Sequence, residues 1–430
     1  MKSRSDYLQT VQSFIKDKET GNRIACELNS HIQQEEESLL NKGFSPEAAE
    51  AEAVRRMGSA PETGRHFQAV YKEKIDGWLV FLLAALMACG FLTALIFSGE
   101  NGYSFNGKVF FTAAGVVASG GLLFVDYRKL RPLGWLFYGL GLAGAMFLTW
   151  GPMSMTTLIL GSVGVQVGPF HVTSIDFIPI LLVGLAAIGS NGPMKVWKGI
   201  VLYVLPVYFF MGAADPNAAF IYTLLFTALF LHKQVNKKIL WSLASLAIIG
   251  AVYAGWWFFA VAASYQKDRL LSFLSPEKFS NGGGYMYLRM EEVISHAAWI
   301  GESSQAEPLP SGHTDFIFLS IVNQLGWAAA LILLTLLILV IGRLFWMTRE
   351  IKEPFGQLLV RGSLVFYAVP VLYHVLMSIG VLPTASFPLP FLSYGMDATV
   401  LHAVLFGLVL SVYRKKHSAS LAARGAAGVQ

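Results

Sequence analysis

The chain has 430 residues, of which 54% are hydrophobic and only 14% are charged. Soluble domains carry about 25% charged residues, so this composition excludes an ordinary soluble protein and indicates a membrane protein. The net charge of +5 comes without an aromatic-interleaved basic patch, and we expect no nucleic acid among the partners. The two cysteines, Cys26 and Cys89, are predicted to lie on opposite sides of a membrane boundary, so neither a disulfide nor a cysteine metal site is implied.

Residues 1–74 are highly charged and precede the first apolar run. Apolar residues recur there at nearly helical spacing from Ile24 to Leu40, while Ser45 and Gly58 occupy the positions of a helix start and a helix stop. We predict a small all-helical domain that stays in the mature protein, because no signal peptide precedes the first apolar run. This domain is either a docking or regulatory module or a leader that packs against the membrane part.

Apolar runs then follow one another to the end of the chain. They cover about 78–98, 108–125, 133–150, 172–190, 196–212, 217–231, 239–262, 315–343, 358–381 and 391–413. About twenty apolar residues span a bilayer, and every second break between the runs carries Lys and Arg, which mark the cytoplasmic side.

The predicted fold is therefore all-α. We expect a polytopic membrane protein with about ten transmembrane helices in residues 77–416 and a small N-terminal cytoplasmic helical domain. Residues 263–314 are predicted to form a large extracellular loop, and 417–430 a cytoplasmic tail. Both termini are thus expected on the cytoplasmic side.

Candidate chemistry lies where the polar segment ending in His313, Thr314 and Asp315 meets the apolar run that begins at Phe316. The predicted topology places this point outside the cell. No glycine-rich phosphate loop ending in Lys-Ser/Thr is present, so any reaction must use energy already stored in its substrate. Asp315 could instead simply begin a helix, where a carboxylate favours the positive end of the dipole.

Two further acids, Asp176 and Asp397, fall within or beside apolar runs. An ionised carboxylate is costly there unless it faces water, a partner or a substrate. Asp397 closely follows Ser393, Tyr394 and Gly395, so we expect it near the same cavity.

The passage from Pro310 to Phe318, and the run Pro388-Leu-Pro390 followed by Ser393-Tyr-Gly395, resemble signatures of the SEDS family. This family includes FtsW, RodA and SpoVE. The segment from Tyr265 to Pro276 resembles the family's outer loop, and the likeness extends over roughly 77–416. The leader resembles the permease-prefix domains fused ahead of bacterial permeases, which suggests a divergent paralogue.

The resemblance implies a peptidoglycan glycosyltransferase that polymerises lipid II, the undecaprenyl-linked disaccharide-pentapeptide, at the outer face of the bacterial cytoplasmic membrane. Polyprenyl diphosphate would be the leaving group, and Asp315 matches the catalytic Asp that acts as general base. The implied substrate-binding residues are Arg269, His313, Thr314, Ser393, Tyr394, Gly395 and Asp397. Arg269 is a candidate partner of the diphosphate, whose charge could also be offset by a divalent cation. A class B penicillin-binding protein is the expected protein partner.

Plain structural alternatives stand beside these roles. His313 could be an interfacial histidine, Arg269 could snorkel to lipid headgroups, and the Pro388-Leu-Pro390 run could be a turn only. At the level of function, the alternatives are a non-catalytic lipid-linked-sugar binding protein or transporter and a membrane interaction or sensor protein. The resemblance does not distinguish cell elongation, cell division and sporulation.

The sequence also departs from the family pattern at several positions. Asn323 and Gln324 stand where the family usually has an acidic pair, and Asp397 stands where Gly-Ser-Ser usually follows Ser-Tyr-Gly. We hypothesise that Asp397 partly replaces the missing acids. The family's Gln-Pro-Ser-Glu passage is approximated by residues 173–176, and its glycine-rich outer segment is replaced by residues 295–301.

Overall fold

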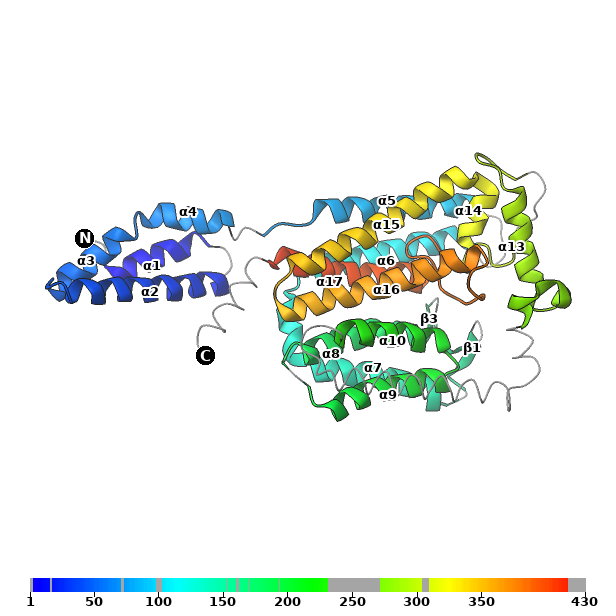
Figure 1. Cartoon of the computed structure of the whole chain (residues 1–430), viewed down its shortest axis with the longest axis horizontal. Coiled ribbons are helices and arrows are strands. Elements are labelled where there is room, and N and C mark those ends of the chain that lie inside the picture. The colour runs from blue at the N-terminus through cyan, green and yellow to red at the C-terminus, as the bar shows by residue number, and fades with distance from the viewer. Residues whose placement is uncertain are drawn as a thin grey trace. The chain divides into compact units, whose positions relative to one another are not determined.

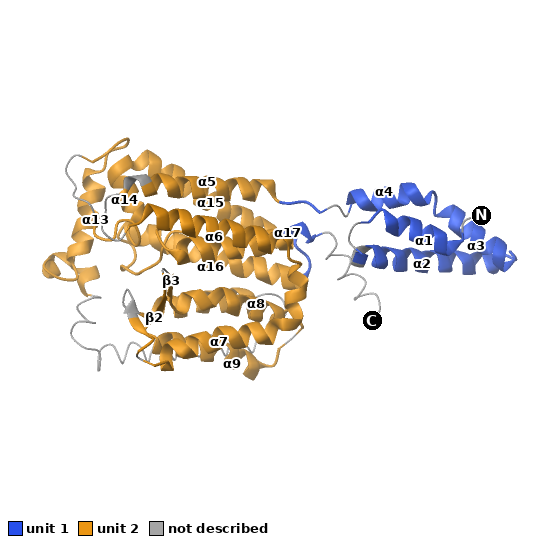
Figure 2. Ribbon diagram, turned by 180° about the vertical axis from the view of Figure 1, so that it is seen from behind, with its two compact units in different colours: residues 1–75, 351–353, 413–430 blue, residues 76–350, 354–412 orange. Residues whose placement is uncertain are grey.

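The computed structural model describes residues 3–15, 18–70, 73–97, 103–152, 154–159, 162–168, 170–192, 194–230, 271–303 and 309–416 (Figure 1). The chain divides into two compact units, which Figure 2 shows in different colours. Unit 1 comprises residues 1–75, 351–353 and 413–430, and unit 2 comprises residues 76–350 and 354–412.

The described part of residues 1–75 in unit 1 is a helical bundle. Its helices are α1 (Arg4–Ser13), α2 (Lys18–Leu40), α3 (Pro46–Arg56) and α4 (Ala60–Val70). Their apolar faces share one core that includes Tyr7, Val11, Ile24, Ile32, Leu39 and Ala53. Ser45 is the N-cap of α3, and Gly58 has a φ of +83°, which lets the chain leave α3 and enter α4. Leu40, part of the predicted apolar pattern, is 39% exposed and lies outside this core.

Unit 2 is built from helices, one small sheet and short turns. The helices of its described residues are α5 (Gly77–Ile96), α6 (Phe105–Phe124), η1 (Tyr127–Leu133), α7 (Gly134–Trp150), η2 (Ser174–Phe177), α8 (Ile178–Gly189), α9 (Val196–Gly212), α10 (Pro216–Phe230), η3 (Pro276–Phe279), α13 (Tyr285–His296), α14 (Ile317–Leu325), α15 (Trp327–Glu350), α16 (Pro354–Ser378), the π-helix η4 (Asp397–Leu401) and α17 (His402–Arg414). The antiparallel sheet, which the sequence did not predict, has the order β1 (Thr157–Ile159), β2 (Ser162–Val167), β3 (Phe170–Val172).

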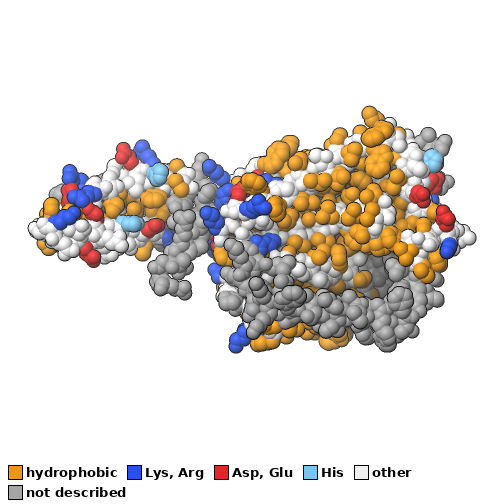
Figure 3. All heavy atoms as spheres, viewed as in Figure 1, with side chains coloured by type: hydrophobic (Ala, Val, Ile, Leu, Met, Phe, Trp, Pro, Cys, Tyr) orange, Lys and Arg blue, Asp and Glu red, His pale blue; other side chains and the backbone are white. Residues whose placement is uncertain are grey.

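Several helices of unit 2 have the length and composition of membrane spans. Six described helices are long and apolar enough: Gly77–Ala94, Phe105–Phe124, Tyr127–Trp150, Trp327–Glu350, Pro354–Ser378 and Asp397–Arg414. Shorter apolar helices cover Ser174–Gly189, Val196–Gly212 and Pro216–Phe230. Figure 3 shows hydrophobic side chains covering the face formed by α5 and α15, with charged side chains gathered near the helix ends. The chain is therefore an all-α polytopic membrane protein, since helices satisfy their own backbone groups within lipid.

Most of the predicted runs coincide with these helices, with three exceptions. The run 391–413 begins in a loop, because the helix there starts only at Asp397. The run 239–262 lies outside the described residues. The run 315–343 is not one helix, because the chain breaks at Gly326 between α14 and α15 and the second helix continues to Glu350. Gly326 has a φ of +84°, and a Cβ there would lie 2.7 Å from the Trp299 carbonyl oxygen. Backbone from the preceding loop therefore packs into the break, where only glycine fits without strain.

The predicted outer loop 263–314 is partly helical where it is described. It contains η3 and α13, and α13 packs on α14 and α16 through an apolar cluster. The cluster consists of Tyr287, Met290, Val293, Leu309, Phe316, Leu319 and Met377. This cluster fixes the turn before α14, and that turn carries the candidate acid Asp315.

Candidate active site

Asp315 lies in the turn before α14 and is half-buried. Its Oδ1 accepts a hydrogen bond of 2.7 Å from the Ser386 hydroxyl. Burial raises the pKa of Asp315 above its ordinary value, while the Ser386 hydrogen bond and the charge of His313 oppose that rise. The N-cap of α14 is Phe316 and makes no side-chain cap, so the Asp315 carboxylate is directed to Ser386 and does not cap the helix.

The proline-rich loop of residues 386–395 packs directly on this turn. The Ser393 hydroxyl donates to the Thr314 carbonyl at 2.8 Å, and the Tyr394 amide donates to the His313 carbonyl at 2.9 Å. Ser393 is fully buried and also accepts from the Leu389 amide at 2.9 Å, so its hydroxyl is engaged within the protein. The structure thus brings together four of the predicted site residues, and it gives Ser393 a structural part in joining the two segments.

A buried lysine of α6 binds the same loop. The Lys108 ammonium, on α6, donates to the carbonyl oxygens of Phe391, Leu392 and Ser393 at 2.8, 3.2 and 3.0 Å. Lys108 is 1% exposed. Three carbonyl groups replace the water that an ammonium ion needs, which makes its burial tolerable.

A lone cation in an apolar run is an expected mark of function in a membrane protein. Lys108 therefore had a sequence signal, but the contacts that reveal its role join residues more than 280 positions apart.

Aromatic rings surround His313 on the same side of unit 2. The His313 ring lies 5.8 Å from the Tyr103 ring, 6.2 Å from the Tyr394 ring and 6.4 Å from the Phe97 ring, measured between centroids. Burial raises the pKa of Tyr103 to about 12, so its hydroxyl stays protonated. That hydroxyl is buried and has no hydrogen-bond partner among the described residues.

Asp397 begins the π-helix η4 and faces a second acid. Its carboxyl group lies within hydrogen-bonding reach of the Asp176 carboxyl group. Asp176 accepts from the Thr173 amide at 2.6 Å through Oδ2, while its buried Oδ1 has no conventional donor among the described residues. Asp397 contacts Asp176 and also His402, whose Nδ1 donates to the Asp397 carbonyl at 2.9 Å. That Asp397 partly replaces the missing acids stays a prediction.

The remaining predicted residues are placed as follows. Gly395 has a φ of +135°, a conformation that favours glycine at the turn before η4. The Thr314 hydroxyl donates to the Ser311 carbonyl at 3.2 Å. Arg269 lies outside the described residues. Within the described ranges no group of three or more His, Cys, Asp or Glu side chains could hold a metal ion.

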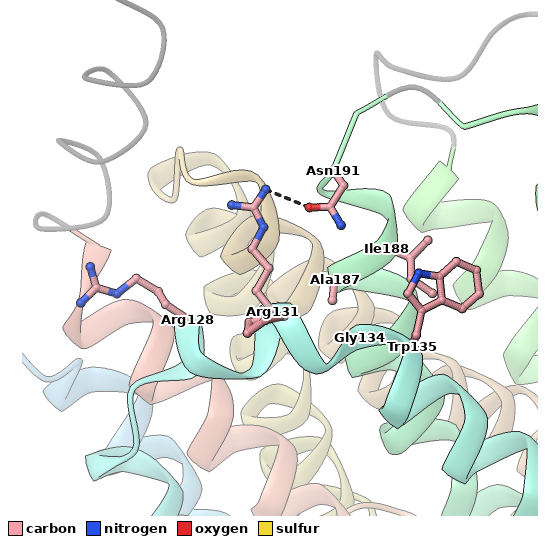
Figure 4. Close-up of a pocket in the computed structure, with 8 residues that line it drawn as sticks. Arg128, Arg131, Gly134, Trp135, Ala187, Ile188 and Asn191 are labelled. Carbon is pink, nitrogen blue, oxygen red and sulfur yellow. Dashed lines mark hydrogen bonds between the residues drawn. The ribbon is translucent and has the colours of Figure 1, made fainter. Parts of the chain in front are cut away.

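A pocket of about 330 Å³ lies at the other end of α6 (Figure 4). The 20 residues of α6 separate it from the Asp315 side by about 30 Å. Arg131 donates there to the Ser190 carbonyl and to Asn191, at 3.3 and 3.1 Å, and so caps the end of α8. Arg128 is paired with the neighbouring Asp126 at 2.7 Å. Both arginines are therefore occupied by structural contacts, and this pocket is separate from the candidate active site.

These features define a class of protein: an all-α polytopic membrane protein that holds one carboxylate between a helix-entry turn and a proline-rich loop. The family model for FtsW, RodA and SpoVE, described as cell cycle proteins, matches residues 77–418. The chain belongs to this family.

Two curated proteins illustrate the similarity in sequence. Peptidoglycan glycosyltransferase MrdB of Escherichia coli K12 is 34% identical over 181 residues, which cover 40% of this chain and 49% of that protein. The chain thus aligns with about half the length of this relative. The probable peptidoglycan glycosyltransferase FtsW of Coxiella burnetii is 25% identical over 367 residues, covering 78% of this chain and 95% of the relative.

Solved structures share the fold. A chain from a peptidoglycan synthase complex superposes with a TM-score of 0.66 at 23% identity, covering 80% of this chain and 98% of that one. RodA of Thermus thermophilus superposes with a TM-score of 0.59 at 20% identity, covering 80% and 97%. At these identities the likeness establishes the fold alone.

Proposed function

We propose that this protein is a peptidoglycan glycosyltransferase that polymerises lipid II at the outer face of the bacterial cytoplasmic membrane. The observation that carries the proposal is the half-buried Asp315 carboxylate, which accepts from Ser386 at the entry to α14. A carboxylate in this setting, with its pKa raised by burial above its ordinary value, is a stronger base than an exposed carboxylate and is suited to take a proton. Membership of the FtsW/RodA/SpoVE family and the names of the curated relatives support the same reaction class.

In the proposed reaction, Asp315 removes the proton from a sugar hydroxyl of one lipid-linked disaccharide. The hydroxyl oxygen attacks the anomeric carbon of a second molecule and forms the new glycosidic bond with inversion. The bond from that carbon to the phosphate oxygen breaks, and its electron pair leaves with polyprenyl diphosphate. The leaving group is a good one, so the reaction requires no nucleotide.

The other predicted residues have supporting roles in this proposal. Arg269 would bind the diphosphate, because its planar fork matches phosphate oxygens. His313 and Tyr394, with the protonated Tyr103 beside them, would contact the sugars. Thr314, Ser393 and Gly395 would shape the backbone around the acceptor, and Asp397 would lie deeper, beside Asp176.

We further propose that both termini are cytoplasmic and that a class B penicillin-binding protein is the partner. The charge pattern of the loops supports the orientation. The fold shared with a chain of a peptidoglycan synthase complex supports the partner.

The direct test is polymerisation of fluorescent lipid II by the purified full-length protein, with glycan strands resolved on a gel. We expect Asp315→Asn to lower the rate by about 10²–10⁴-fold, the usual contribution of a general base. The matched control is Asp6→Asn, the same change at an exposed position in unit 1, which should retain the wild-type rate. Thermal unfolding of each variant reports whether it is folded.

A wild-type rate for folded Asp315→Asn would contradict the assigned base. If the wild-type protein makes no strands, the non-catalytic alternative gains support, and flipping of lipid-linked sugar in vesicles would test it. The two outcomes therefore separate a wrong residue from a wrong reaction.

A further inference from the structure

Ser386 holds one of the two carboxylate oxygens of Asp315. The hydroxyl donates to Oδ1 at 2.7 Å, and the described residues supply no partner for Oδ2. A carboxylate that is hydrogen-bonded on one oxygen keeps the other available to accept a proton from a ligand. The two oxygens of Asp315 are therefore not equivalent.

Three contacts fix Ser386 relative to Asp315. The His374 side chain, which is fully buried on α16, lies between the segments that carry the two residues. Its Nδ1 donates to the Phe387 carbonyl at 2.7 Å, and its Nε2 accepts from the Phe318 amide at 3.4 Å. One neutral tautomer satisfies both bonds, because a carbonyl can only accept and an amide can only donate.

The third contact comes from α10. The Asn217 side-chain amide donates to the Ser386 carbonyl at 3.3 Å. The serine is thus held by its neighbour Phe387 on one side and by its own carbonyl on the other. Its hydroxyl meets Asp315 from a fixed backbone.

We propose that Ser386 is a positioning residue of the active site, whose hydroxyl orients the Asp315 carboxylate through Oδ1 and leaves Oδ2 as the atom that takes the proton of the acceptor sugar. This inference rests on the proposed function, since it assigns the reacting atom of the proposed base. The hydroxyl also favours the ionised form of Asp315, because it donates to the carboxylate.

The sign of the pH effect follows from that contact. Burial raises the pKa of Asp315, and the Ser386 bond and the His313 charge lower it again. Other titratable groups on the surrounding elements are His374 on α16, Tyr287, Arg289 and Glu292 on α13, Lys108 on α6 and Tyr394 on the loop. Removing the Ser386 hydroxyl removes one of the two contacts that lower the pKa of Asp315, so this pKa should rise. On acidification the ionised carboxylate, which is the base, should then be protonated at a higher pH than in the wild type.

The test measures kcat and KM for lipid II against pH with the full-length protein. For Ser386→Ala we expect kcat to fall about tenfold and KM to stay within about twofold. The acidic limb of the kcat–pH profile should move up by about one pH unit, because Asp315 loses one hydrogen bond to its charged form. Ser386→Thr keeps the hydroxyl and should retain most of the wild-type kcat and most of the wild-type position of the acidic limb. The matched control is Ser378→Ala, which deletes a buried hydroxyl that donates only to the His374 carbonyl at 2.7 Å and should keep the wild-type limb.

Ser386→Cys keeps the side-chain volume but offers a weak donor, and it should shift the limb in the same direction if Ser386→Ala fails to fold. The inference would be overturned if Ser386→Ala and Ser386→Cys kept the wild-type kcat and the wild-type acidic limb of the pH profile. It would also be overturned if these variants changed only KM, or if Ser378→Ala shifted the acidic limb equally. Full activity of Asp315→Asn would instead overturn the assignment of Asp315 as the base, and a wild-type protein that forms no glycan strands would overturn the proposed function. If Asp315→Asn is inactive while Ser386→Ala keeps the wild-type acidic limb, only the positioning role of Ser386 is overturned.

Discussion

Lys108 should be the anchor of the loop that completes the site, and Lys108→Met tests this directly. Methionine has a similar length but cannot donate, so the carbonyl groups of Phe391, Leu392 and Ser393 lose their shared donor. Phe391 already has a φ of +65°, which is uncommon for a residue with a side chain. The loop conformation therefore depends on contacts such as this one.

The size of the effect can be estimated from these contacts. Each buried carbonyl left without a donor costs about 1–3 kcal/mol. The Leu392 carbonyl keeps the Thr93 hydroxyl at 3.5 Å, so the other two carbonyl groups would cost up to about 6 kcal/mol. Removing the ammonium also removes its desolvation penalty, which amounts to several kcal/mol for a buried ion. We expect a net loss of about 2–4 kcal/mol against local opening of the loop, or roughly 30- to 700-fold in the opening equilibrium.

Hydrogen exchange of the loop amides is the assay. The reporters are the amides of Phe391, Ser393 and Tyr394, which donate to the Ala398, Leu389 and His313 carbonyl groups. The control is Lys129→Met, the same change at an exposed lysine of η1, which should leave their exchange unchanged. If these amides exchange at the wild-type rate in Lys108→Met, the ammonium does not anchor the loop and the reasoning is refuted.

Two further predictions concern packing within unit 2. Gly90→Ala would press a Cβ against the Phe391 carbonyl oxygen and should destabilise unit 2 by about 1–3 kcal/mol in thermal unfolding. Gly120→Ala is the control, because the space around Gly120 is open and the change should cost little. Equal melting temperatures for the two variants would contradict the close contact at Gly90. Arg343 contacts the buried Asp76 carboxylate at 2.6 Å, and the other oxygen of Asp76 caps α5, so Arg343→Met should cost about 3–5 kcal/mol by leaving that charge unpaired. An unchanged melting temperature for this variant would show that the pair adds no stability.

Much of the fold could be predicted because membrane helices are specified by composition. A bilayer requires about twenty apolar residues per span, and the backbone bonds of a helix are local, so no distant contact is needed to predict it. The prediction was wrong where distant contacts decide, as at Gly326, where the Trp299 backbone packs against the chain and separates α14 from α15. The small sheet β1–β3 was missed because its strands are only three to six residues long.

The candidate site was predictable only in part. Asp315, Ser393 and Tyr394 were identified because they stand in recognisable motifs, and the structure brings their segments together. Ser386 and His374 have no such motif, and their sequence separation from Asp315 gives no indication of a contact. Each contributes a single hydrogen-bonding group, which becomes meaningful only when its partner is known.

The sequence by itself therefore determined the class of protein, the helices and the identity of the candidate acid, because hydrophobic length and local motifs act along the chain. Only the tertiary structure decided which groups surround that acid. Ser386 reaches Asp315 from 71 positions away, and Lys108 reaches the loop from 283 positions away. Such contacts arise because burial forces each polar group to find a partner wherever the packed helices place one.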